Sequence, residues 1–79
     1  MSTKLKYLRP DYPPTPAGKL EMFLDFYREV AFNQARPPEK AREAIDFAIA
    51  KVRAMTAPFY DVPLQDMIDG LEAIKKEIP

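Results

Sequence analysis

Apolar residues recur at helical spacing most clearly between Pro38 and Met55. A helix turns about 100° per residue, so residues three or four positions apart share one side. Pro37 and Pro38 suit the first turn of a helix, and Pro58 closes its far end. The pattern therefore predicts a helix over residues 38–56. Its apolar side consists of Ala41, Ala44, Ile45, Ala48, Ile49, Val52 and Met55.

Phe47 breaks this pattern, because it projects beyond the apolar side among Lys40, Lys51 and Ala54. Two interpretations are open: another part of the chain covers Phe47, or a binding partner does. The rest of the polar side is expected to be solvated and to carry weak ion pairs. These expected pairs are Lys40 with Glu43 and Arg42 with Asp46.

A first helix is predicted over residues 16–34, since Thr15 can cap the free N–H groups and Pro16 fits the first helical position. The side expected to face the central helix holds Leu20, Phe23, Leu24, Tyr27, Val30 and Ala31. Met22 and Phe26 fall on an adjacent side, and Phe32 falls almost opposite the core. Such a wide apolar surface indicates either a helix sandwiched between two elements, which we favour for Met22 and Phe26, or an oligomer interface.

A third helix is predicted over residues 62–78, with Asp61 as its cap and Pro63 in its first turn. Its apolar side is formed by Leu64, Met67, Ile68, Leu71, Ile74 and Ile78. Gly70 lies inside this helix, where glycine costs about 1 kcal/mol relative to alanine. It indicates either a close backbone approach by a neighbouring element or a kink.

Together these elements predict an all-α protein: a three-helix bundle made of an antiparallel helical hairpin and a C-terminal helix, in a single domain over residues 16–79. Residues 1–15 are predicted to form an extended, Pro-rich arm, because proline disfavours helix both at its own position and before it. The arm is expected to lay Tyr7 and Tyr12 across the helices. The alternative is that its PxxP spacings bind an aromatic groove.

Composition limits the chemistry of this chain. It has 79 residues and a net charge of zero, with neither cysteine nor histidine. Zinc sites, histidine acid–base catalysis and thiol nucleophiles therefore lack their residues. Asp25 and Glu29 lie one helical turn apart but are expected on a solvated surface. We expect no enzyme activity, metal or cofactor, and a cytoplasmic location without a membrane partner.

The leading hypothesis is a small protein-interaction module, a regulator or inhibitor that docks on a larger protein or self-associates. It has more large apolar side chains than a core of this size should consume. In size and make-up it is similar to small inhibitors and regulators encoded by phages and other mobile elements. The candidate partner-binding residues are Tyr7, Tyr12, Met22, Phe26, Phe32 and Phe47.

Two alternatives remain at this stage. One is a nucleotide or small-ligand binder at a subunit interface, such as a phage counter-defence protein. Its candidate ligand and phosphate contacts are Lys19, Arg36, Arg53 and Tyr60. The other is a nucleic-acid binder that uses the basic residues of the N-terminal arm, although four cations are few for a chain without an overall positive field.

Overall fold

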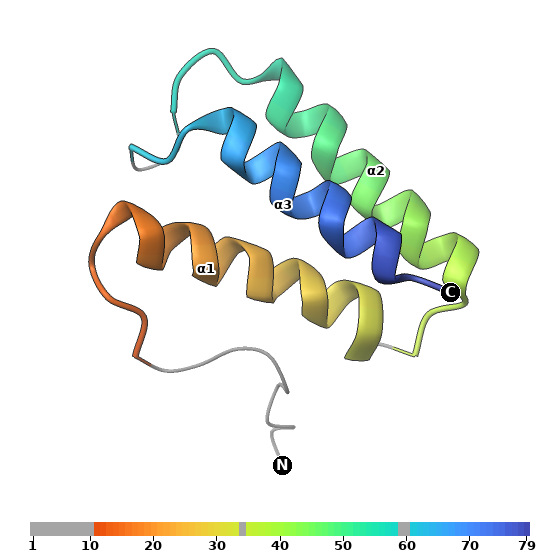
Figure 1. The fold of residues 1–79 in the computed structure, drawn as a ribbon. Coiled ribbons are helices and arrows are strands. Elements are labelled where there is room, and N and C mark those ends of the chain that lie inside the picture. The colour runs from red at the N-terminus through yellow and green to blue at the C-terminus, as the bar shows by residue number, and fades with distance from the viewer. Residues whose placement is uncertain (1–10, 34, 59–60) are drawn as a thin grey trace.

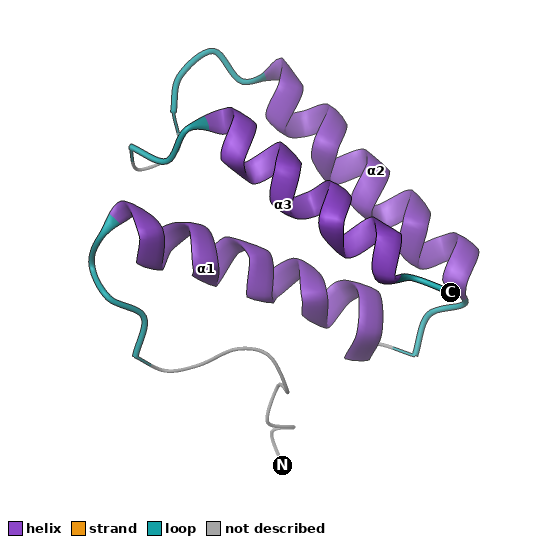
Figure 2. Ribbon diagram, viewed as in Figure 1, coloured by secondary structure: helices purple, strands orange, loops and turns teal. Residues whose placement is uncertain are grey.

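The computed structural model describes residues 11–33, 35–58 and 61–79, which form helices and connecting segments without a strand. Helix α1 spans Pro16–Arg28 and continues into a π-helical turn, η1, over Glu29–Asn33. Helices α2 and α3 span Pro38–Ala54 and Leu64–Glu77. The predicted all-α class is confirmed (Figure 2).

The three helices lie side by side, with α1 and α3 running in the same direction and α2 running opposite to them (Figure 1). Helix α3 packs against both α1 and α2, whereas η1 supplies much of the contact between the first helical segment and α2. The predicted arm up to Pro10, with Tyr7, and the predicted site residue Tyr60 lie outside the described residues. In the part of the chain that is described, no helix has the length and apolar character needed to cross a membrane.

Helix α1 begins as its sequence predicts. Thr15 has an extended backbone, and its Oγ1 accepts a hydrogen bond of 3.1 Å from the Gly18 N–H. Pro16 takes the first helical position, where its missing N–H costs nothing. The cap fixes the point at which residues 11–15 join the start of the helix. It thereby directs this segment along α1.

The start of α3 differs from the prediction. Asp61 does not cap the helix, because it takes a left-handed backbone conformation with φ 65° and the helix begins only at Leu64. Pro63 occupies the cap position without a side-chain hydrogen bond. The physical reason is Val62, which is 1% exposed. The free energy gained by burying the Val62 side chain in the core exceeds the gain from starting the helix two residues earlier. Aspartate at position 61 also tolerates the left-handed conformation better than most residues.

The core lies where the apolar sides of α2 and α3 meet, and the end of η1 and the segment before α3 add to it. The predicted apolar side of α2 is buried except for Ala44 and Met55, which are half-buried. Leu20, Phe23, Leu24 and Tyr27 of α1 pack against this core while remaining partly exposed. The buried cluster consists of Ala31, Ala41, Ile45, Ala48, Ile49, Val52, Val62, Met67, Ile68, Leu71, Ile74 and Ile78.

Polar contacts between α2 and α3 show which side of α2 faces its neighbour. Asp46 Oδ1 lies 2.7 Å from Lys75 Nζ. Arg53 Nη2 lies 3.5 Å from Glu72 Oε2. The predicted pairing of Asp46 with Arg42 is wrong, since Arg42 donates instead to the Pro79 carbonyl. Helix α3 runs along this side of α2, so these side chains reach across to it. The predicted pair of Lys40 and Glu43 does form, with 3.7 Å between Lys40 Nζ and Glu43 Oε1.

Gly70 is the contact point between α3 and α1. A Cβ atom at this position would lie 2.5 Å from Leu24 Cδ2, which is closer than two carbon atoms approach without bonding. A neighbouring helix does approach Gly70 closely, but through the Leu24 side chain and not through its backbone. Leu24 fills the space that the missing side chain leaves, and this contact sets how near α1 lies to α3.

We predict that Val52→Asp unfolds the protein. Val52 is 3% exposed, so an unpaired carboxylate there would cost several kcal/mol, comparable with the whole stability of a small domain. Thermal unfolding followed by circular dichroism measures this. Ala50→Asp, on the exposed side of the same helix, is the matched control and should keep a cooperative transition. A Val52→Asp variant as stable as this control would contradict the assigned core.

We predict that the effect of Gly70→Ala changes sign with residue 24. In the wild-type background the added methyl meets the Leu24 methyls, and overpacking of about 1–3 kcal/mol exceeds the gain of about 1 kcal/mol in helix propensity. In a Leu24→Ala background the space is free, and the same substitution should stabilise the protein. Denaturant unfolding of the four variants measures both effects, and equal effects in the two backgrounds would refute the contact.

Candidate functional site

Met22 and Phe26 are exposed on α1, at 39% and 49%. The structure therefore does not match the expected sandwich, since no described element encloses them. The Phe26 and Tyr27 rings form an edge contact at a centroid distance of 5.1 Å, and the Tyr27 and Phe23 rings form another at 5.0 Å. Burial raises the pKa of the Tyr27 hydroxyl above its ordinary value of 10.0. The result is an ordered row of rings whose outer member faces solvent.

Phe47 is the most exposed large apolar side chain among the described residues, at 67%. The amino group of Lys51 lies 5.5 Å from the centre of its ring, at cation–π distance. Of the two interpretations of Phe47, the described residues do not support cover by another part of the chain. Its ring is left on the surface of α2.

The side chains of Met22, Phe26 and Phe47 all point away from α3. Leu24 points at Gly70 of α3, and Met22 and Phe26 are each two positions from it, about 160° around the helix. On α2, the side facing α3 is marked by Asp46 and Arg53. Phe47 lies about 100–120° around the helix from both. The helix that completes the core therefore cannot cover these residues.

Phe32 lies elsewhere than expected. The sequence places it almost opposite the core, but it is half-buried and packs against the core cluster. The cause is η1, because a π-helical turn contains more residues than an α-helical turn and brings later side chains round by a smaller angle. A uniform helical period does not anticipate this change. Phe32 contributes to the fold in this structure, and its role in partner binding stays a prediction.

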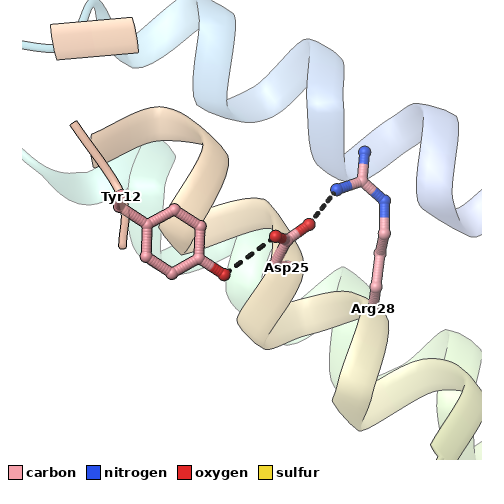
Figure 3. Close-up of polar contacts among 3 residues, drawn as sticks. All are labelled: Tyr12, Asp25 and Arg28. Atoms are coloured by element: carbon pink, nitrogen blue, oxygen red, sulfur yellow. Dashed lines mark hydrogen bonds and ion pairs between the residues drawn. The ribbon is translucent and has the colours of Figure 1, made fainter. Parts of the chain in front are cut away.

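A buried carboxylate joins residues 11–15 to α1 (Figure 3). Tyr12 donates its hydroxyl proton to Asp25 Oδ2 at 2.8 Å, and Arg28 Nη1 lies 2.6 Å from Asp25 Oδ1. Asp25 and Glu29 were expected on a solvated surface, yet they are 7% and 1% exposed. Both Asp25 oxygens accept hydrogen bonds that compensate for the water lost on burial. Tyr12 is thus engaged within the fold.

Gly18 explains why the chain can lie so close to α1 here. A Cβ atom on Gly18 would lie 2.1 Å from the Pro13 carbonyl oxygen, so any other residue would displace the segment. Gly18 and Asp25 are seven positions apart and share one side of α1. The missing side chain of Gly18 and the carboxylate of Asp25 thus both face residues 11–15.

Two of the predicted ligand contacts, Lys19 and Arg36, lie at opposite ends of the first helical segment. Lys19 is in the first turn of α1, whereas Arg36 follows η1 at the other end of the same helical segment. At 1.5 Å per residue, roughly 20 Å separate these ends. Arg53 is paired with Glu72 on α3, and Tyr60 lies outside the described residues. One phosphate group cannot contact both Lys19 and Arg36 in a single copy of the chain.

A shallow pocket of about 450 Å³ lies between α2 and α3, lined by Arg42, Glu72, Lys75 and Lys76. Three of these four side chains already have partners within the fold: Pro79, Arg53 and Asp46. Within the described ranges, no group of three or more acidic side chains is placed to hold a metal ion. The exposed apolar residues of α1 and α2 therefore make the stronger candidate site.

No protein family, curated protein or solved structure matches this chain. Its function therefore has to be argued from its own side chains.

We predict that Tyr12→Phe destabilises the protein by about 1–2 kcal/mol, because it removes a hydrogen bond to a buried carboxylate. Chemical denaturation monitored by circular dichroism measures the loss. Tyr27→Phe is the matched control, since it also removes one hydroxyl but no hydrogen bond to the described residues, and it should cost much less. Equal effects of the two substitutions would show that the contact of Tyr12 with Asp25 does not hold residues 11–15 against α1.

Proposed function

We propose that this chain is a small three-helix bundle that acts as a non-enzymatic protein-interaction module, a regulator or inhibitor in the cytoplasm. It docks through exposed apolar side chains on a larger protein or on another copy of itself. The observation that carries the proposal is that Met22, Phe26 and Phe47 remain exposed although the core is closed without them. The absence of cysteine supports a reducing compartment.

The exposed residues of α1 suit insertion into a groove. Met22 and Phe26 are four positions apart, which places them one above the other on one side of the helix. Side chains at this spacing are the anchors by which an amphipathic helix binds an apolar groove on another protein. The partner of α1 should therefore offer an apolar groove about one helix wide.

The local packing of these residues also favours binding. The edge contact between Phe26 and Tyr27 restricts the Phe26 ring before any partner arrives. Ordering a free side chain on binding costs about 0.5–1.5 kcal/mol, so a ring that is already held loses less. Aromatic anchors of this kind dominate the energy of many protein interfaces.

The experiment is affinity capture from an extract of the native cell, with wild-type protein, Phe26→Asp and Ala73→Asp as baits. Ala73 is exposed on α3, so its substitution adds the same charge away from the proposed surface. We expect a protein that wild type and Ala73→Asp retain and that Phe26→Asp loses, because a carboxylate cannot enter an apolar groove without a large desolvation cost.

Circular dichroism melts of all three baits establish that they are equally folded. Retention of the same proteins by every bait, or of none by the wild type, would contradict docking through α1.

A further inference from the structure

The exposed side of α2 carries a symmetric pattern centred on Phe47. Glu43 lies four positions before Phe47 and Lys51 four positions after it. Ala44 and Ala50 lie three positions to either side, and Lys40 and Ala54 lie seven positions to either side. These six residues fall within about 60° of Phe47 around the helix, and all are exposed except the half-buried Ala44.

Such a pattern complements itself when two copies of the helix meet in opposite directions. A two-fold axis through Phe47 places each residue opposite the one equally far on the other side of Phe47 in the second copy. Phe47 then meets Phe47, and Ala44 meets Ala50. Glu43 of each copy faces Lys51 of the other, which gives two ion pairs of opposite charge around an aromatic centre.

We propose that α2 forms an antiparallel homodimer contact through this surface, with Phe47 at its centre and pairs of Glu43 with Lys51 on either side. This inference rests on the proposed function, and it names a second copy of the chain as the partner of the α2 surface. The described contacts leave these residues available. Glu43 pairs only weakly with Lys40 at 3.7 Å, and both side chains are more than 60% exposed.

Side-chain size favours the same arrangement. Helices pack 8–10 Å apart depending on the side chains between them, and the small side chains of Ala44, Ala50 and Ala54 leave room beside the two Phe47 rings. A close approach brings the two Phe47 rings into contact and removes them from water. Lys51 now lies over the Phe47 ring of its own copy, and a small rotation takes its amino group toward Glu43 of the second copy.

The charges disfavour the parallel arrangement. With two copies of α2 in the same direction, Glu43 would face Glu43 and Lys51 would face Lys51, which is repulsive at both positions. The α1 surface offers no such pattern around Phe26, because Glu29 and Val30 on its following turn are buried. A second copy therefore fits α2, whereas α1 remains for a different protein.

The size of this contact sets its strength. Helix α2 has 17 residues, which corresponds to a length of about 25 Å. One helix of this length buries less than the roughly 800 Å² per partner of a standard stable interface. The dimer should therefore be reversible and depend on protein concentration.

The test uses two charge reversals, Glu43→Lys and Lys51→Glu, in the full chain, with molecular mass measured by sedimentation equilibrium over a concentration series. Each single variant places like charges opposite one another at both ends, so its dimer dissociation constant should rise by at least about tenfold. An equimolar mixture of the two variants restores opposite charges at every pair and should form a heterodimer. The double variant Glu43→Lys with Lys51→Glu should dimerise like the wild type.

Phe47→Asp is the control for the centre of the contact. Introduced into both partners of the mixture, it should abolish the heterodimer while each chain keeps its circular dichroism melt. Monomeric wild-type protein up to about 1 mM would overturn the dimer. So would single reversals without effect, or a mixture that stays monomeric.

These results are separable from the proposed docking of α1. A monomer whose capture of another protein still depends on Phe26 would refute the dimer and leave the α1 surface in place. A dimer that captures no protein in a Phe26-dependent way would support the α2 contact and refute docking through α1.

Discussion

Burial of the apolar side of α3 is the constraint on which the other features depend. Met67, Leu71 and Ile74 are almost fully enclosed, and α3 is the helix that packs on both of the others. Each neighbour must turn its own apolar side toward α3, and Gly70 lets α1 come near enough to do so. The burial of apolar area at this meeting point is the main source of stability available to so short a chain.

This constraint also explains the exposed rings. Helix α1 is apolar over more of its circumference than one neighbour can cover, so once Leu24 meets Gly70, Met22 and Phe26 turn outward. Phe47 is left outside for the corresponding reason, because the ion pairs of α2 with α3 lie on another side of the helix. The exposed apolar surface is thus a geometrical consequence of how the core closes. Keeping such residues in water brings no benefit to folding, which is why we connect them with binding.

The sequence predicted the parts of the fold that depend on local periodicity, such as the buried stripe of α2 and the outward position of Phe47. It failed where tertiary contacts or a changed helical period decide the outcome. Phe32 packs against the core because η1 is a π-helical turn, and a constant period cannot contain that change. Asp25 is buried because Tyr12 and Pro13 lie over α1. The spacing of apolar residues along a helix does not show that another segment lies against it.

The same limit applies to the candidate site. Glu43 and Lys51 looked like ordinary solvated charges, because along one helix they are too far apart to meet. Their relation to Phe47 becomes meaningful only when α3 is known to lie against a different side of α2. A dimer through α2 would leave Met22 and Phe26 of both copies uncovered, since those residues belong to α1. Such a dimer would present two α1 surfaces to a partner that has two grooves. Once the first groove is occupied, the second meets its α1 surface at a high effective concentration, so a weak contact at each surface would suffice to hold the partner.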